Sequence, residues 1–281
     1  MHSAIERWHA LLDARAQQMD AAYARLGRTS ADFWDRRAKG YHRSTRDTVT
    51  GDPFYTRLLS TVTPQTSILD IGAGTGRFAL ALASRANYVT AVEPNMAMSQ
   101  IMHQEMLARG ISNVTIIPTT WQDAPTDLHA DIVACSHVLY PIREVDTFIA
   151  KLLAATHRTC FIYMRALHFD QVTAPLWQHF HGDRRHLPPS YIHALDVMFE
   201  MGLYANVEIV TMPNTMRYPS LDIAVTEMLE QLILPDDDNT QTELRRLLEL
   251  WLIEQNGMLT PPAQKFASAI ITISPNQEDR S

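Results

Sequence analysis

The chain has 281 residues, of which 46% are apolar and 20% are charged, and its formal net charge is −7. This composition supports an ordinary buried core and excludes global disorder, and the length suits one α/β domain with additions. The acidic balance argues against broad binding to nucleic acid or anionic membranes, and no apolar run approaches the ~18–20 residues of a membrane span.

The N-terminal residues show neither the apolar region nor the small-residue cleavage site of a secretory signal. The two cysteines, Cys135 and Cys160, both fall in apolar runs typical of strands. A buried free thiol is the simplest interpretation of each, ahead of a disulfide, a metal ligand or a nucleophile. These features predict a cytoplasmic protein.

The start of the chain predicts two helices. Apolar side chains recur at steps of three and four through the first 26 residues, as on one face of a helix. Ser3 and Glu6 have the spacing of a capping box at its start, and Gly27 can end it. A second, short helix is expected between Ser30, as its cap, and Gly40, as its stop.

From residue 67 onward, short apolar runs alternate with helical runs, a pattern typical of a parallel sheet covered on both faces. Residues 1–50 are expected to form a helical extension or lid, and residues 51–281 the main domain with a helical insert at about 214–262. The predicted strands are 67–71, 88–93, 113–118, 130–135, 159–165, 204–213 and 266–275, and the predicted helices among and between them are 76–85, 94–110, 143–156, 219–234 and 240–255.

The stretch SILDIGAGTGRFALALA predicts a strand, a glycine turn and a helix, which together can form a nucleotide cradle. Its spacing is Gly72-x-Gly74-x-Gly76, whereas dinucleotide-binding proteins have G-x-G-x-x-G, and Arg77 occupies the position of their third glycine. No G-K-[ST] follows, which argues against a P-loop. The turn still allows a ligand to approach the backbone closely.

Glu93 ends the next predicted strand, where its carboxylate can accept two hydrogen bonds from the vicinal hydroxyls of a ribose. The alternative is a negative charge placed near the start of a helix, ahead of Pro94. The first interpretation favours a ligand that carries adenosine.

Four motifs occur in order between Ser67 and Tyr140: ILDIGAGTGRFALALA, AVEPN, TTWQDAP and ADIVACSHVLY. This series resembles the class I S-adenosylmethionine-dependent methyltransferases. The later run HFDQVTAPLWQHFHG, the helical insert and the final strand are similar to a bacterial group of small-molecule-type methyltransferases. The resemblance implies an α/β, Rossmann-like seven-stranded sheet, mostly parallel with an antiparallel last strand and with helices on both faces. It also implies S-adenosylmethionine as cofactor, S-adenosylhomocysteine as product and a small-molecule methyl acceptor as partner.

The resemblance also assigns roles to residues. Asp70 and the glycine backbone would face the methionyl portion, Glu93 the ribose and Asp123 the adenine amino group. Tyr41 would be a lid residue, although helix packing is an alternative for it and for Trp34. The full set implied for cofactor binding is Tyr41, Asp70, Gly72, Ala73, Gly74, Gly76, Glu93, Pro94, Asn95, Met96, Trp121, Gln122, Asp123 and Ser136.

Methyl transfer from a sulfonium requires mainly alignment and exclusion of water, and alignment can contribute ~7–11 kcal/mol. A general base is needed only when the acceptor keeps its proton at neutral pH. The candidates at strand ends are His137, Tyr140 and His168. For His137 the alternative is a histidine that is only hydrogen-bonded at the end of a strand.

A segment rich in His and Arg follows, and we expect it to form a pocket rim. Trp177 and His181 would contact the acceptor, and Arg184 or Arg185 would pair with an acidic group on it. A solvated basic loop is the alternative. His179 and His181 are two residues apart and cannot share one helix face, so no metal site is predicted.

Two alternative functions remain at this stage: an NAD(P)-binding oxidoreductase, and a methyltransferase-like protein that binds cofactor without catalysis. No nucleic-acid partner is expected, because SHVLYPI after the fourth strand lacks the N-P-P-Y or S-P-P-Y pattern of many nucleic-acid methyltransferases. No membrane partner is expected either.

Overall fold

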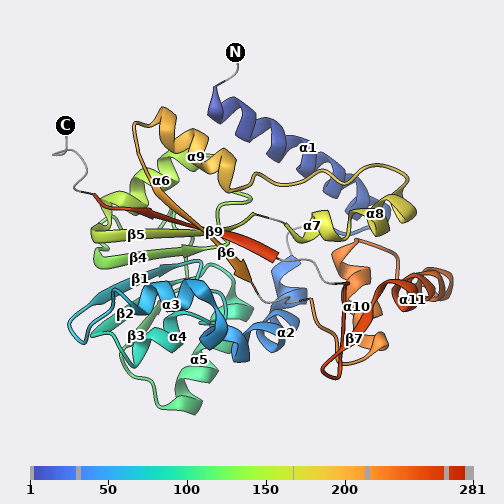
Figure 1. Ribbon diagram of the computed structural model, residues 1–281, viewed down its shortest axis with the longest axis horizontal. Coiled ribbons are helices and arrows are strands. Elements are labelled where there is room, and N and C mark those ends of the chain that lie inside the picture. Colours follow the sequence, from blue (N-terminus) through green and yellow to red (C-terminus); the bar gives the residue numbers. More distant parts are fainter. Residues whose placement is uncertain (1–2, 30–32, 167, 213–215, 263–265, 276–281) are drawn as a thin grey trace.

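The computed structural model describes residues 3–29, 33–166, 168–212, 216–262 and 266–275. A seven-stranded sheet in the order β3-β2-β1-β4-β5-β9-β6 forms its centre (Figure 1). β9 runs antiparallel to both β5 and β6, and the remaining neighbours pair in parallel. The strands are β1 Ser67–Ile71, β2 Tyr88–Val92, β3 Val114–Ile117, β4 Ala130–Ser136, β5 Thr156–Arg165, β6 Asn206–Met212 and β9 Phe266–Ile273. This confirms the predicted fold class.

Helices cover both faces of the sheet (Figure 1). Alternate residues of each central strand enter different cores: Ile68 packs with α3, α4 and α5, whereas Leu69 packs with α1, α6 and α9. The helices are α1 Ala4–Arg25, α2 Phe33–Thr45, α3 Pro53–Leu59, α4 Ala79–Ala83, α5 Met96–Arg109, α6 Val145–Ala154, α7 Phe169–Val172, α8 Ala174–His181, α9 Tyr191–Glu200, α10 Leu221–Gln231 and α11 Asp238–Trp251, with a 3-10 helix at Arg46–Gly51.

The first helix forms as predicted. Ser3 and Glu6 make the reciprocal capping box, and Gly27 adopts a φ of +62° just beyond the last turn. Trp8 is fully buried and its Nε1 donates to the carbonyl of Ile142 at 2.7 Å. The helix is therefore fixed against the main body of the protein.

The second helix does not stop at Gly40. α2 continues to Thr45, and the proposed cap Ser30 lies outside the described residues. A glycine inside a helix costs only about 1 kcal/mol relative to alanine, which tertiary contacts can offset. A Cβ at Gly40 would stand 3.5 Å from Glu227 on α10, so the glycine lies where these two helices approach closely.

The last predicted helix of the insert is also too long. α11 ends at Trp251, and the remaining residues form a two-stranded hairpin of β7 Ile253–Gln255 and β8 Met258–Thr260. Asn256 and Gly257 link these strands with φ values of +52° and +74°. Asn-Gly with two positive φ angles is a strong signal for a tight hairpin turn, and it overrides the helical pattern here.

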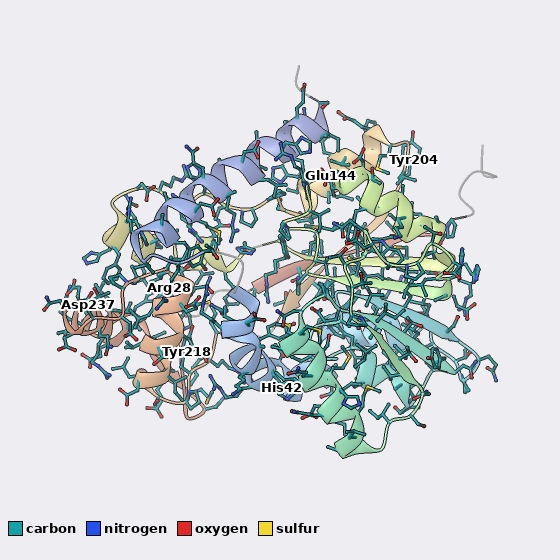
Figure 2. The ribbon with its side chains drawn as sticks, turned by 180° about the vertical axis from the view of Figure 1, so that it is seen from behind. Arg28, His42, Glu144, Tyr204, Tyr218 and Asp237 are labelled. Atoms are coloured by element: carbon teal, nitrogen blue, oxygen red, sulfur yellow. The ribbon has the colours of Figure 1, made fainter. Side chains whose placement is uncertain are left out.

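α2 lies between the sheet domain and the insert. At one end Asp35 accepts a hydrogen bond from Asn95 Nδ2 at 2.6 Å, and Arg36 is 2.8 Å from Glu230 on α10. Seen from behind, Arg28 and Tyr218 lie on the side of the molecule formed by the insert, and Glu144 and Tyr204 lie toward the other side (Figure 2). Residues of α2 and of α10 in the insert line a cavity between them.

Candidate functional site

The glycine turn lies between β1 and α4 and has three positive φ angles: +68° at Gly72, +58° at Gly74 and +82° at Gly76. A Cβ at Gly72 would stand 2.3 Å from Val138, and one at Gly76 would stand 2.7 Å from Leu80. Gly74 has more space, since its nearest neighbours would be Met98 and Tyr41, at 3.6 and 3.7 Å. Backbone conformation favours glycine at all three positions, and packing also disfavours a side chain at Gly72 and Gly76.

Asp70 precedes this turn on β1 and is 2% exposed. Its carboxylate accepts the backbone N–H of Ala79, at the start of α4, and its Oδ2 has no hydrogen-bond partner among the described residues. Burial, together with a smaller contribution from the nearby Glu93 charge, raises the pKa of Asp70 from 3.8 to about 7. A negative group already occupies the start of α4, which disfavours a pyrophosphate there.

Glu93 follows β2 and holds the turn from the other side. Its Oε2 accepts the N–H of Gly74 at 2.7 Å and its Oε1 accepts the N–H of Asn95 at 2.8 Å. Burial raises the pKa of Glu93, and these two hydrogen bonds oppose the shift. The cap of α5 is Asn95, whose Oδ1 accepts the N–H of Met98, so Glu93 is not the helix cap. Each carboxylate oxygen keeps a second acceptor position.

The predicted adenine-side residues differ in their accessibility. Met96 is 58% exposed and Pro94 is also exposed, whereas Trp121 is buried in the core. Lys151 Nζ lies 4.8 Å from the Trp121 ring and donates to the carbonyls of Trp121 and Gln122. Gln122 and Asp123, in contrast to Trp121, have exposed side chains. Asp123 accepts a hydrogen bond from Thr120 Oγ1 at 2.7 Å.

Ala73 and Ser136 complete the predicted cofactor set. Ala73 is buried within the glycine turn, and its N–H donates to the carbonyl of Val92 at 3.1 Å. Ser136 is half-buried at the end of β4, next to Tyr163 of β5. Both lie at the carboxyl edge of the sheet, where ligands bind in open α/β folds.

His137 and Tyr140 come together beyond β4. His137 has a φ of +61°, an uncommon conformation for a residue with a side chain, and its N–H donates to the carbonyl of Tyr163. Its Nδ1 lies 3.1 Å from the Tyr140 hydroxyl, which itself accepts the N–H of Arg165 at 2.6 Å. The tyrosine hydroxyl and the His137 ring thus share a hydrogen bond, and the backbone N–H of Arg165 holds the hydroxyl in place.

Burial sets the ionisation of this cluster. It lowers the pKa of His137 well below its usual value and raises the pKa of Tyr140 to about 12. His168 lies beside them, with its ring centroid 5.3 Å from that of Tyr140, and burial lowers its pKa to about 4. The His168 Nδ1 accepts the N–H of Asp170 at 3.1 Å, so its Nε2 carries the proton. The three predicted catalytic side chains are together and neutral at pH 7.

The predicted acceptor rim is not brought to this place. Trp177 is 1% exposed, with its ring stacked 3.8 Å from His181 and 3.7 Å from the Arg185 guanidinium. His181 Nε2 lies 2.8 Å from the carbonyl of Leu232. His181 thus links α8 to the insert, while Trp177 is buried in the core and Arg185 lies over its ring.

The two arginines after α8 behave differently. Arg184 is exposed, and its carbonyl accepts a hydrogen bond from Gln18. Arg185 is buried and lies 3.4 Å from Asp170, which is also 2.9 Å from Arg15 of α1. Arg185 thus pairs with an internal carboxylate and not with a ligand, whereas the pairing of the exposed Arg184 with a ligand stays a prediction.

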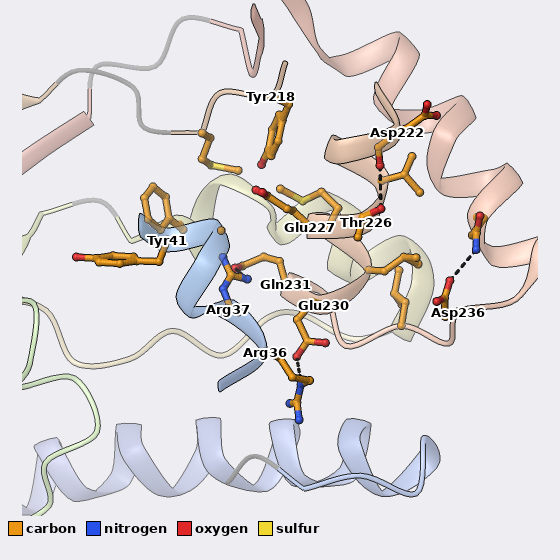
Figure 3. Close-up of a pocket in the computed structure, with 18 of the residues that line it drawn as sticks. Arg36, Arg37, Tyr41, Tyr218, Asp222, Thr226, Glu227, Glu230, Gln231 and Asp236 are labelled. Atoms are coloured by element: carbon orange, nitrogen blue, oxygen red, sulfur yellow. Dashed lines mark hydrogen bonds and ion pairs between the residues drawn. The ribbon is translucent and has the colours of Figure 1, made fainter. Parts of the chain in front are cut away.

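A cavity of about 670 Å³ lies beside α2, where α10 and α11 face it (Figure 3). Arg37, Glu227 and Gln231 extend into the space between α2 and α10 (Figure 3). Of the predicted site residues, only Tyr41 lines this cavity, and the same ring approaches Gly74 of the glycine turn. The lining that the sequence reasoning missed includes Arg165, Phe169, Met216 and Tyr218.

Among the residues that the structure describes, no set of three or more His, Cys, Asp or Glu side chains is arranged to hold a metal ion. In the same part of the chain, no helix has the length and apolar character needed to cross a membrane.

Known proteins share this fold. Residues 68–159 match the family described as a methyltransferase domain. An uncharacterized protein of Haemophilus influenzae is 26% identical over 185 residues, and the match covers 63% of this chain but only 65% of that relative.

Two solved structures are similar to this chain at the level of the fold. The YcgJ protein of Bacillus subtilis has a TM-score of 0.53 at 16% identity, with 78% of this chain and 97% of that one covered. Magnesium protoporphyrin IX methyltransferase of Synechocystis, crystallised with bound S-adenosylhomocysteine, has a TM-score of 0.54 at 12% identity, with 92% and 99% covered. Residues 68–159 thus match a methyltransferase domain, and the chain shares its fold with a solved methyltransferase crystallised with S-adenosylhomocysteine.

Proposed function

We propose that this protein transfers a methyl group from S-adenosylmethionine to a small molecule bound in the cavity beside α2. The observation that carries the proposal is the position of Tyr41. Its ring approaches Gly74 in the turn and also lines the cavity, so the cofactor cradle and the acceptor space share a wall. A methyl donor and its acceptor need such a shared boundary for in-line transfer.

The residues around the turn fit the cofactor. Asp70 presents a buried carboxylate oxygen with no hydrogen-bond partner among the described residues, which suits the methionyl ammonium group. Glu93 retains acceptor positions for ribose hydroxyls, and the space at Gly74 lets a ligand approach the backbone. S-adenosylmethionine supplies an already activated sulfonium methyl group. The oxidoreductase alternative lacks a comparable fit, because Asp70 already occupies the start of α4.

The chain's own contribution to the reaction is mainly orientation. His137 and His168 are neutral, and Arg165, which lines the cavity, is hydrogen-bonded through its N–H to Tyr140 beside them, so this cluster borders the acceptor space. The lowered pKa values of the two histidines make them weak bases. The cluster therefore suits an acceptor atom that needs little help in losing its proton, held in a site that excludes water.

A small-molecule acceptor is favoured by the size of the cavity. Its volume of about 670 Å³ falls in the ~300–1,000 Å³ range of small-ligand sites. Apolar side chains such as Phe169, Met216 and Tyr218 share its lining with charged groups. This mixture suits a compact ligand with one apolar and one polar part.

A transfer assay with label on the methyl group tests this proposal. The purified protein is incubated with methyl-tritiated S-adenosylmethionine and a cell extract separated into an ultrafiltrate and a macromolecular fraction. We expect label to enter the ultrafiltrate, and Glu93→Ala to abolish the transfer through loss of cofactor binding. Label only in the macromolecular fraction would overturn the small-molecule acceptor. Tight cofactor binding without transfer to either fraction would favour a binding protein without catalysis.

A further inference from the structure

Arg165 occupies an unusual position at the end of β5. It lines the cavity, and its guanidinium carbon lies 3.8 Å from the centre of the Phe169 ring. Burial lowers the pKa of Arg165, and the groups that act on it electrostatically include three tyrosines and a second arginine, Arg77. Among the described residues, its guanidinium has no hydrogen bond and no ion pair with a carboxylate.

The nearby acid does not neutralise Arg165. Asp52 feels its charge, but this carboxylate lies 2.7 Å from Arg77 and also caps α3 through the N–H of Phe54. His137 and His168 also face Arg165, and both are neutral. Among the described side chains, the Arg165 guanidinium therefore has no carboxylate paired with it.

The charges at the outer end of the cavity are arranged differently. Glu230 pairs with Arg36 at 2.8 Å, and Arg245 pairs with Asp222. Asp236 accepts a hydrogen bond from Gln241 at 2.6 Å. Glu230, Asp222 and Asp236 thus have partners already, whereas Arg165 has no carboxylate partner among the described residues.

We propose, resting on the function proposed above, that the methyl acceptor carries a carboxylate or phosphate group that pairs with Arg165. An arginine stays protonated at neutral pH, and its planar fork can hold such a group through two parallel hydrogen bonds. Phe169 stacks against the guanidinium, and both side chains line the cavity. The N–H of Arg165 is bonded to Tyr140, so the anion would place the acceptor beside the His137–Tyr140 pair.

The same chemistry could come from the carboxylate of the cofactor itself, and the experiment must separate these two sources. Calorimetric titration with S-adenosylhomocysteine does so for the wild type and Arg165→Met. We expect the two proteins to bind it with the same dissociation constant, within about twofold. Weakening by tenfold or more in the variant would assign Arg165 to the cofactor. That outcome would overturn this inference but leave the proposed function standing, whereas no binding to the wild type would overturn the function itself.

Anion binding is then measured by thermal unfolding of the complex with S-adenosylhomocysteine. Sodium benzoate, sodium phosphate and the neutral benzamide are compared with sodium chloride at equal ionic strength. We expect benzoate or phosphate to raise the melting temperature of the wild type and of the control Arg57→Met, whose arginine is exposed on α3. Neither anion should raise the melting temperature of Arg165→Met. Benzamide should leave the melting temperatures of the wild type and of both variants unchanged. Equal responses in wild type and Arg165→Met, or no response to either anion in the wild type, would overturn the proposal.

The melting temperatures of the wild type and Arg165→Met without any ligand give a test that does not depend on the choice of anion. A cation kept for a ligand costs stability when the ligand is absent, so Arg165→Met should melt at or above the wild-type temperature. A lower melting temperature would show that Arg165 supports the fold, and would contradict its assignment as a ligand-binding group.

Discussion

Replacing Asp70 by Asn should change how the stability of the protein depends on pH. Burial holds the pKa of Asp70 at about 7 in the folded state, against an ordinary 3.8. The folded state therefore binds the proton more tightly, and wild-type stability falls as pH rises from 4 to 7. At about 1.4 kcal/mol for each tenfold change in proton affinity, the loss is on the order of 4 kcal/mol. The Asn side chain has no such titration.

Urea unfolding of the cofactor-free proteins at intervals from pH 4.5 to 8 measures this difference. Asn keeps an acceptor for the Ala79 N–H but introduces an unpaired amide group, which costs about 1–3 kcal/mol at every pH. The free energy of unfolding of Asp70→Asn, relative to wild type, should therefore rise by a few kcal/mol across the range. Parallel curves for the two proteins would refute the claim that Asp70 carries a buried, uncompensated charge.

Three further changes test the site. At pH 7 Asp70 is about half protonated, so binding of S-adenosylhomocysteine should release about half a proton as its ammonium group lowers the pKa of Asp70. Calorimetry in two buffers of different ionisation enthalpy measures this release, and Asp70→Asn should show none. Gly72→Ala would place a Cβ 2.3 Å from Val138 at a φ of +68°, so it should lower the free energy of unfolding in urea by about 1–3 kcal/mol and weaken cofactor binding; unchanged values would contradict the packing argument. Tyr140→Phe leaves the Arg165 N–H without its acceptor, so it should cost about 1–3 kcal/mol in urea unfolding and lower kcat more than the cofactor KM, whereas an unchanged kcat would exclude the hydroxyl from the reaction.

Local patterns in the sequence predicted the fold well, whereas the roles of the individual cofactor-binding residues remain predictions. Strand and helix periods, the glycine spacing and the capping box at Ser3 depend on near neighbours, and each element they predicted is present within a few residues. The hairpin at Asn256 was missed because the surrounding apolar pattern was helical, although its Asn-Gly pair is itself a turn signal.

The acceptor cavity could not be predicted in the same way. Segments far apart in the chain form its walls: Arg36 of α2, for example, pairs with Glu230 of α10. A pattern of neighbouring residues cannot predict such a contact. The orientation of Trp177 depends on the same kind of contact. Its burial, and the fold of Arg185 over its ring, follow from packing of α8 against α1 and the insert, which a count of histidines and arginines does not reveal.

Calorimetric titration of wild type and Glu93→Ala with S-adenosylhomocysteine and with NADH tests the central claim most directly. The geometry of Asp70, Gly74 and Glu93 predicts that the wild type binds S-adenosylhomocysteine at micromolar concentration (about 8 kcal/mol) and does not bind NADH. Glu93→Ala should weaken that binding by tenfold or more, since it removes the group that holds the turn and accepts the ribose hydroxyls. Binding of NADH alone, or an affinity for S-adenosylhomocysteine that the substitution leaves unchanged, would contradict the assignment of this turn as a methyl-donor site.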